Sequence, residues 1–281
     1  MKFSLIVATF GRSLELQRLM ESIVIQRYPD LELIIVDQNA DDRVVRVVDS
    51  FKGQLNIVHR VSRPGATRAR NVGLAVATGD VIGFPDDDCW YPESLLGRVA
   101  GFLSGNDRWD GIVGHTVDAS GRTTLPWHDS AGALTPAMSW RRSVTYVYFL
   151  RRLAATATGG FDESLGPGAG TPWGAGDDND FMLRALTKGA RVYFDPDLAV
   201  HHPPFFPGFD AKSIDKRASY ARADGRVLRK NPMPLWWILA FFGVPLARWV
   251  TALPTCDIAR LRFHWVTLSG RARGFLDRVQ A

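Results

Sequence analysis

The stretch that organises the chain is Val81-Ile82-Gly83-Phe84-Pro85-Asp86-Asp87-Asp88-Cys89-Trp90. Its apolar first part predicts the end of a short buried strand. Asp86, Asp87 and Asp88 then follow the carboxyl end of that strand, where open α/β sheets bind ligands. Three adjacent carboxylates repel one another, and a hard divalent cation such as Mg²⁺ or Mn²⁺ would neutralise them. The alternative is a solvated acidic turn, but the preceding strand and the motifs elsewhere in the chain favour a ligand site.

Strands and helices alternate through the first half of the chain. The residues predict strands at 3–8, 31–36, 55–58 and 81–84, and helices at 14–24, 44–51 and 66–77. This rhythm predicts an α/β fold in which parallel strands are joined by crossover helices. Neither G-x-G-x-x-G after the first strand nor G-x-x-x-x-G-K-[ST] occurs, so a dinucleotide fold and a P-loop enzyme are not favoured.

The second half is less regular. Short strands are predicted at 146–150, 192–194 and 198–200. Residues 165–176 form a loop rich in glycine and proline, long enough to be functional. It leads into Asp177-Asp178-Asn179-Asp180-Phe181 at the start of a predicted helix, and Asp180 is expected to cap that helix.

The composition is that of an ordinary globular protein of 281 residues, with 46% hydrophobic and 22% charged residues. Two distant cysteines, Cys89 and Cys256, indicate neither a disulfide framework nor a zinc site and favour a reducing compartment. The net charge of +5 is unevenly divided. Residues 211–281 contain 13 Lys plus Arg and 4 Asp plus Glu, which is +9, so residues 1–210 carry 5 − 9 = −4. A basic tail on an acidic body indicates an anionic partner for the tail.

Five segments resemble, in order and spacing, the motifs of a known family. They are SLIVATF at 4–10, LIIVD at 33–37, ARNVG at 69–73, FPDDD at 84–88 and GDDNDF at 176–181. Together they resemble the family 2 glycosyltransferases, and the resemblance runs from about residue 2 to residue 202. It implies a GT-A fold with a mostly parallel central sheet in residues 1–210. It also implies an inverting transfer from a nucleotide diphosphate sugar that uses Mg²⁺ or Mn²⁺.

The resemblance assigns roles on the donor side. Asp86-Asp87-Asp88 matches the D-x-D element, in which Asp88, together with Asp86, would bind the metal ion and Asp86 or Asp87 would face the ribose or sugar. The nucleotide-sugar-binding residues would be Thr9, Asp37, Gln38, Arg68, Arg70, Asp86 and Asp87. Gln38 stands where many members have an aspartate that contacts the base; its amide can still pair with a pyrimidine edge, so a UDP-sugar is favoured. For either arginine, a helix-surface ion pair is the alternative.

Further roles concern the acceptor and the metal ion. Asp178 matches the family's general base, which takes the acceptor hydroxyl's proton. Asp177 and Trp173 are placed on the acceptor side. The alternative for the acidic run is a set of charges that complement the helix dipole. His201-His202 resembles a position at which some GT-A enzymes have a further metal ligand, and His201 is the predicted ligand; a polar strand end is the alternative.

The tail combines charge with apolar aromatic residues. Residues 211–230 predict a helix, weakened by Gly225, and 234–250 form an apolar run interrupted by Pro245 and Arg248. Aromatic residues beside basic ones suit a membrane interface. Similar tails in bacterial polysaccharide glycosyltransferases imply a cytoplasmic protein, peripheral on the inner face of the cell membrane, with a lipid-linked or glycan acceptor. The alternative is a helical appendage packed on the sheet.

Two other functions compete with this prediction. A sugar-phosphate nucleotidylyltransferase shares the strand–helix plan, but Thr9-Phe10-Gly11-Arg12 matches its phosphate loop poorly. A nucleic-acid-binding protein would also be basic; here the positive charge is confined to the tail and no nucleic-acid motif is present, so no nucleic-acid partner is expected.

Overall fold

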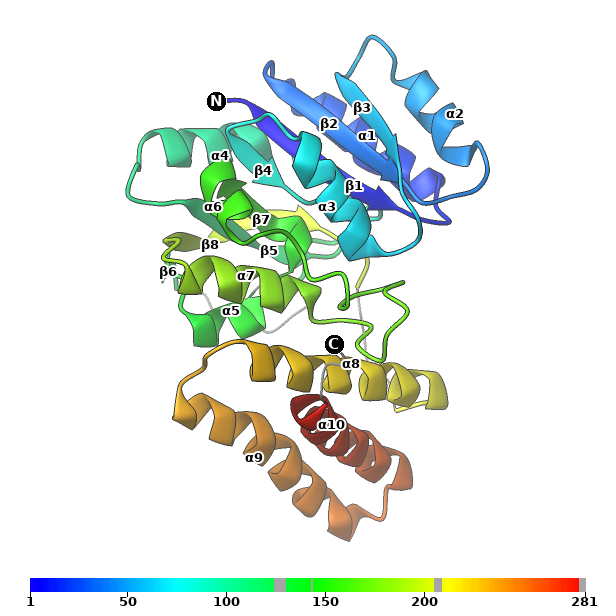
Figure 1. Cartoon of the computed structure of the whole chain (residues 1–281), viewed down its shortest axis with the longest axis vertical. Helices are drawn as coiled ribbons and strands as arrows, with labels where there is room; N and C mark the ends of the chain where they lie inside the picture. The colour runs from blue at the N-terminus through cyan, green and yellow to red at the C-terminus, as the bar shows by residue number, and fades with distance from the viewer. Residues whose placement is uncertain (124–129, 143, 205–208, 278–281) are drawn as a thin grey trace.

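One mixed sheet forms the centre of the N-terminal part of the molecule (Figure 1). The computed structural model describes residues 1–123, 130–142, 144–204 and 209–277. Within these residues the strand order is β3-β2-β1-β4-β7-β5-β8-β6. The strands are β1 (Phe3–Thr9), β2 (Leu31–Asp37), β3 (Ile57–Val61), β4 (Val81–Gly83), β5 (Gly111–Val117), β6 (Gly132–Ala133), β7 (Tyr148–Arg151) and β8 (Val192–His201). The chain thus has the predicted α/β architecture.

The first half of the sheet is parallel. Strand β1 pairs with β2 from Phe3↔Leu31 to Thr9↔Asp37 and with β4 on its other side. Both long strands are almost wholly buried, as expected of apolar runs covered on both faces. Parallel strands end at the same edge, so this register brings Thr9, Asp37 and the residues that follow β4 together.

The second half departs from the predicted strands. The strands predicted at 192–194 and 198–200 are one strand, β8, whose pairing with β5 shifts register between Val113 and His115. At this shift, Gly114 of β5 packs directly against the backbone of β8. A Cβ at position 114 would lie 2.0 Å from the Leu198 carbonyl oxygen, so the absence of a side chain makes room for the extra residues of β8. The strand predicted at 146–150 begins as a 3₁₀ turn, η1 (Thr145–Val147), before β7, which pairs antiparallel with β4 and β5.

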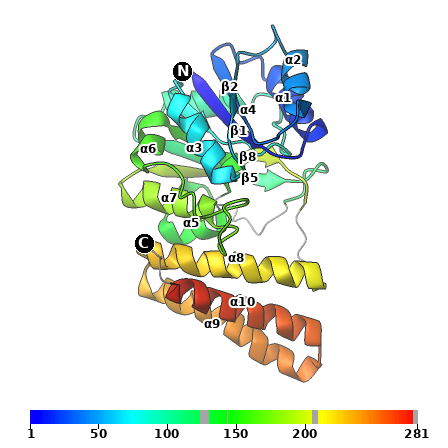
Figure 2. The same ribbon diagram turned by 45° about the vertical axis from the view of Figure 1, so that its right-hand side comes forward.

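Helices pack on the sheet and bury an extensive apolar core (Figures 1 and 2). They are α1 (Leu14–Ile25), α2 (Arg43–Ser50), α3 (Ala66–Val76), α4 (Leu95–Ser104), α5 (Pro136–Arg142), α6 (Arg152–Ala157) and α7 (Asp177–Thr187). The predicted helices at 14–24, 44–51 and 66–77 agree with α1, α2 and α3 to within about a residue or two at each end.

Three helices form the C-terminal part. They are α8 (Ala211–Lys230), α9 (Leu235–Ala252) and α10 (Ile258–Leu276), with a 3₁₀ turn η2 (Leu253–Thr255) between the last two. Helix α8 lies beneath α7 and the glycine-rich loop, and α10 packs against α8 (Figures 1 and 2). A domain boundary between residues 210 and 211 stays a prediction.

Glycines allow α8 and α10 to touch backbone to backbone. A Cβ on Gly225 would lie 2.0 Å from the Arg271 carbonyl oxygen, and one on Gly274 would lie 1.8 Å from that of Arg222. Gly270 lies against Ala221 in the same contact. The glycine that weakens α8 in isolation is therefore required by its packing against α10.

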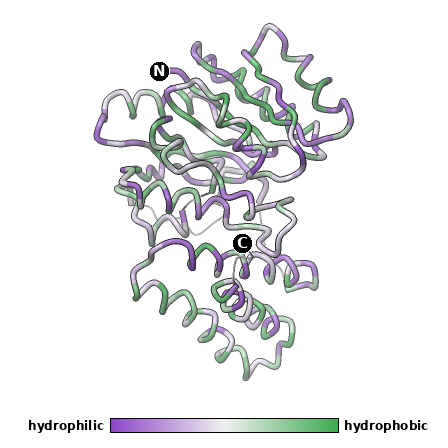
Figure 3. Tube along the Cα trace, viewed as in Figure 1, coloured by the Kyte–Doolittle hydropathy of each residue, from purple (hydrophilic) through white to green (hydrophobic). Residues whose placement is uncertain are grey.

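Helix α9 is the most apolar segment of the C-terminal part (Figure 3). Trp237 and Phe241 are buried against neighbouring helices, whereas Trp236 and Leu239 are 62% and 64% exposed. Among the described residues, Leu235–Thr255 is the one helical segment long and apolar enough to cross a membrane, with 22% of its most apolar window buried.

We predict that Gly274→Ala destabilises the protein by about 1–3 kcal/mol, because the added methyl group meets the α8 backbone and forces the two helices apart. Gly243→Ala in α9 is the matched control, since a Cβ there meets nothing and alanine favours helix. Denaturant unfolding of the purified variants measures both changes. Equal stability of the two variants would contradict the close α8–α10 contact.

Candidate active site

The three carboxylates that follow β4 lie in different surroundings. Asp87 is buried, whereas Asp86 and Asp88 are partly exposed. Burial raises the pKa of Asp86, and the Arg70 charge opposes that rise. Burial likewise raises the pKa of Asp87 against the opposing charge of Arg12. The pKa of Asp88 is lowered, because its contacts with His202 and Arg12 outweigh its burial. Each carboxylate of the triplet is therefore paired with a cationic side chain or with His202 at the edge of the sheet.

Arg70 of α3 connects the triplet to the acidic start of α7. Its Nη2 lies 2.8 Å from Asp86 Oδ1, and its Nη1 lies 2.6 Å from Asp177 Oδ2. The guanidinium is 9% exposed and lies over the Phe161 ring. Burial lowers its pKa, but the charges of Asp86 and Asp177 outweigh burial and raise it above the ordinary value. Two motifs about 90 residues apart are thus joined by one buried cation.

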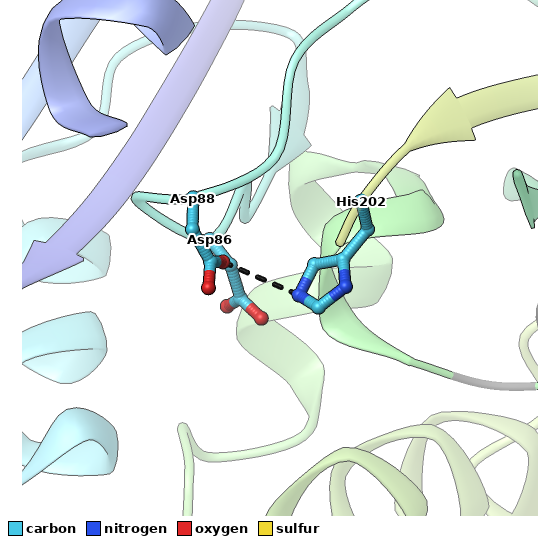
Figure 4. Close-up of side chains that lie close together, drawn as sticks. All are labelled: Asp86, Asp88 and His202. Atoms are coloured by element: carbon cyan, nitrogen blue, oxygen red, sulfur yellow. Dashed lines mark ion pairs between the residues drawn. The ribbon is translucent and has the colours of Figure 1, made fainter. Parts of the chain in front are cut away.

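Asp86, Asp88 and His202 form a group that has the donor atoms of a metal site (Figure 4). One ligand atom of each lies within 4.8 Å of the others, and His202 Nε2 lies 3.2 Å from Asp88 Oδ1. The Tyr146 ring stacks on the imidazole and Nδ1 lies 2.7 Å from the Pro203 carbonyl oxygen, so the ring is held in place. Two carboxylate oxygens and an imidazole nitrogen suit Mn²⁺ well and Mg²⁺ acceptably.

The predicted ligand His201 lies outside this group. Its ring stacks on Trp90 at 5.1 Å, and its Nδ1 lies 3.1 Å from the Asp118 carbonyl oxygen. His201 is also the last residue of β8 and bridges to Trp90. Because successive side chains of an extended chain point to opposite faces, the neighbouring His202 is the one directed to the carboxylates. The structure thus places His202, and not the predicted ligand His201, beside the carboxylates.

Arg12 is a neighbour of the triplet that sequence reasoning did not select. It forms ion pairs with Asp87 and with Asp88, the latter at 2.8 Å, while its own side chain remains 40% exposed. Burial lowers its pKa, but the two carboxylate charges raise it overall. The sequence does carry a signal for Arg12, because it follows the end of the first strand and so lies at the same sheet edge as the triplet.

Asp178 lies at the start of α7 beside Asp177 and within the field of Asp86. Burial and the adjacent Asp177 charge raise its pKa to about 8, although Arg70 opposes the rise. The Tyr148 hydroxyl donates to its backbone carbonyl at 3.1 Å. A carboxyl group with a pKa near neutrality is suited to proton transfer.

The remaining donor-side residues fall into two groups. Thr9, Asp37 and Gln38 are buried at the ends of β1 and β2, at the same sheet edge as the triplet. Gln38 accepts a hydrogen bond from Gly65 N at 2.7 Å and donates to the Thr9 carbonyl at 3.3 Å, so it already ties two segments together. Arg68 is paired instead with Glu163, at 3.0 Å on the surface of α3, which matches the ion-pair alternative.

The two residues predicted on the acceptor side, Asp177 and Trp173, lie in different parts of the structure. Asp177 is buried in the site by its contact with Arg70, whereas Trp173 is turned toward the C-terminal helices. The Trp173 indole nitrogen donates to Asp277 at 2.8 Å, and its ring lies under the Arg226 guanidinium. Asp180 does not cap α7 as predicted, because Gly176, at φ +80°, holds the N-cap position and α7 begins at Asp177.

The sheet thus places acidic residues at its carboxyl edge, at the ends of β2 and β4. The profile described as "Glycosyl transferase family 2" matches residues 4–161, which is more than half of the chain. The chain belongs to this family and is a glycosyltransferase, so the nucleotidylyltransferase and nucleic-acid-binding alternatives are set aside.

Known proteins resemble the chain over nearly its whole length. It is 25% identical over 270 residues to a PGL/p-HBAD biosynthesis glycosyltransferase of Mycobacterium tuberculosis, covering 94% of this chain and 96% of that one. Staphylococcus aureus TarS in complex with UDP-GlcNAc matches with a TM-score of 0.62 at 19% identity, covering 97% and 91%. The mannosyltransferase PcManGT from Pyrobaculum calidifontis, in complex with GDP-Man and Mn²⁺, matches with a TM-score of 0.67 at 16% identity, covering 99% and 88%.

Proposed function

We propose that this glycosyltransferase moves a sugar, with inversion, from a nucleoside diphosphate sugar to a hydroxyl group of a lipid-linked or glycan acceptor. The transfer would serve the assembly of a cell-surface or exported polysaccharide. The observation that carries the proposal is the Asp86–Arg70–Asp177 bridge. It brings a group suited to a metal ion and a diphosphate next to Asp178, a carboxylate suited to act as a base.

Asp178 performs the proton transfer in this proposal. The ionised carboxylate accepts the proton of the acceptor hydroxyl as the oxygen attacks the anomeric carbon, and the bond to the nucleoside diphosphate breaks on the opposite face. A single displacement of this kind inverts the configuration at that carbon. The raised pKa of Asp178 means that the active, ionised form increases as the pH rises toward 8 in the free enzyme.

Asp86, Asp88 and His202 would hold a divalent cation, Mn²⁺ or Mg²⁺. When bound, the ion supplies positive charge to the leaving diphosphate. Arg12 and His202 balance part of the charge of Asp88 in the described structure. Because Arg12 is half-exposed, its guanidinium can leave Asp88 for the donor phosphates. The Mn²⁺ complex of PcManGT supports a metal ion in this fold.

The proposed donor is a UDP-sugar. The TarS complex with UDP-GlcNAc supports a UDP-sugar, which the sequence also favours, while PcManGT binds GDP-Man in the same fold. Thr9, Asp37 and Gln38 would line the base and ribose site at the strand ends.

The exposed side of α9 would bind a membrane surface on the cytoplasmic side. Leu235, Trp236, Leu239, Val244 and Val250 are exposed along this helix, and Trp249 contacts the half-exposed Trp265 of α10. Because Trp237 and Phe241 pack inward, the helix has one free apolar face, which favours lying in the interface over crossing the bilayer. The +9 charge of residues 211–281 favours anionic lipids.

We predict that Asp178→Asn keeps donor affinity and lowers the transfer rate by about 10²- to 10⁴-fold, because the amide cannot accept a proton. The rate should also lose its rise with pH between 6 and about 8. The measurement is transfer rate and donor affinity on the same purified variant. Transfer within a few-fold of wild type would remove Asp178 from the mechanism.

Asp88→Ala should weaken Mn²⁺-dependent binding of the nucleoside diphosphate by about tenfold or more, since it removes a carboxylate of the proposed metal group. Isothermal titration with UDP, with and without Mn²⁺, measures the effect. Asp195→Ala is the control, because Asp195 pairs with Arg98 away from the group. Unchanged Mn²⁺ dependence in Asp88→Ala would refute the metal site.

Paired substitution Trp236→Glu and Leu239→Glu should reduce binding to vesicles with about 30% anionic phospholipid by about tenfold or more, because two exposed apolar groups of α9 become charged. Leu153→Glu, at an 81% exposed position on α6, is the matched control. Vesicle co-sedimentation measures binding, and circular dichroism confirms folding. Equal binding by all the variants, or none by the wild type, would exclude α9 as the membrane contact.

A further inference from the structure

Asp180 is a fully buried carboxylate two residues along α7 from the proposed base. Its Oδ2 accepts from Arg184 of the same helix at 2.9 Å. Its Oδ1 lies 2.8 Å from Lys230 Nζ and accepts from Asn231 Nδ2 at 3.0 Å. Two of its three partners thus come from the end of α8.

Lys230 also binds a second carboxylate, that of Asp162. Asp162 begins the segment that leads into the glycine-rich loop, and its Oδ1 accepts from Ser164 N at 2.9 Å and Ser164 Oγ at 2.7 Å. The lysine ammonium therefore joins α8 both to α7 and to the loop that precedes α7.

The same loop lies against the site from its other side. A Cβ on Gly166 would lie 2.9 Å from Asp177 Cγ, and the Leu165 carbonyl accepts from the Thr67 hydroxyl of α3 at 3.0 Å. Gly176, the N-cap of α7, lies close to α8, because a Cβ there would lie 2.9 Å from Val227 Cγ2. The first turn of α7 is thus held between α3, the loop and α8.

Asn231 is itself fixed at the end of α8. It is 5% exposed, and its backbone N–H and side-chain amide both donate to the Val227 carbonyl. Because the Asn231 side chain is fixed to α8, its hydrogen bond with Asp180 fixes α7 relative to α8.

We infer that Lys230 and Asn231 are positioning residues for the reaction: they hold α7 where Asp178 faces the Asp86–Asp88 group. This inference rests on the proposed function. It makes the C-terminal helices part of the catalytic unit, so that a movement of α8 would reach the base through Asp180. Misplacing a reacting group by about 1 Å can lower the rate by about 10²-fold. A small shift of α7 after loss of the Lys230 contact would therefore be visible in kcat.

The test compares Lys230→Met and Lys230→Arg in the full chain, with Lys212→Met, at the exposed start of α8, as the matched control. The probes are UDP-GlcNAc and GDP-mannose with Mn²⁺, and the readout is sugar release to water. Lys230→Met should lower kcat by about tenfold to a hundredfold with a nearly unchanged KM. Lys230→Arg, which keeps the cation, should recover most of the rate, and Lys212→Met should equal the wild type.

Hydrogen exchange provides a second readout that needs no turnover. In Lys230→Met, the amides of residues 177–187 should exchange about tenfold faster or more, while those of 31–37 stay protected. If Lys230→Met does not fold, the double variant Asp180→Asn with Lys230→Met, which removes the buried carboxylate together with its lysine partner, replaces it in both measurements.

Two results would overturn the inference. One is a folded Lys230→Met variant with wild-type kcat and wild-type exchange in 177–187. The other is a loss of rate that only follows the unfolded fraction, with exchange raised equally in 31–37. Should the wild type release no sugar from either probe while exchange responds as expected, the proposed donors fail and the link between α8 and α7 stands.

Discussion

The buried guanidinium of Arg70 is the contact on which the site depends. Its two carboxylate partners come from opposite halves of the chain: Asp86 follows a parallel strand of the first half, and Asp177 begins a helix of the second. A buried charge is stable only when it is paired, and removing one partner leaves the other uncompensated. Arg70 therefore holds the two acidic motifs at a fixed separation, and each motif in turn keeps the arginine buried.

The other carboxylates of the site differ in how they are paired with positive charge. Three groups pair with the carboxylates of the triplet: Arg70 with Asp86, Arg12 with Asp87 and Asp88, and His202 with Asp88. Arg70 is buried, whereas the side chains of Arg12 and His202 are more exposed, at 40% and 21%. In the proposed function the donor phosphates would draw Arg12 away from Asp88, His202 would help to hold the cation, and Arg70 would keep its place. Asp178 has no ion-pair partner among the described residues, and burial together with the adjacent Asp177 charge raises its pKa to about 8.

The C-terminal helices are more tightly integrated than a basic tail suggests. Several of their cationic groups are used within the molecule: Arg222 pairs with Asp277, Arg217 with Asp224, and Lys230 with Asp162 and Asp180. The charge left for an external surface is therefore smaller than the count of basic residues. The close glycine contacts between α8 and α10 keep α9 at the outer side of this unit, with one apolar face uncovered.

The sequence by itself determined the fold class, the order of the first strands and helices, and the position of the triplet at a strand end. These follow from local periodicity and from the rule that parallel strands end at one edge. Only the tertiary structure decided which side chains meet. The choice between His201 and His202 depends on which face of the strand end each side chain takes, and the pairing of Arg70 depends on a helix formed about a hundred residues later. Asp180 and Trp173 point to the C-terminal helices for the same reason. Sequence pattern records which residues are polar, but the partner of a buried polar group is set by packing between distant segments.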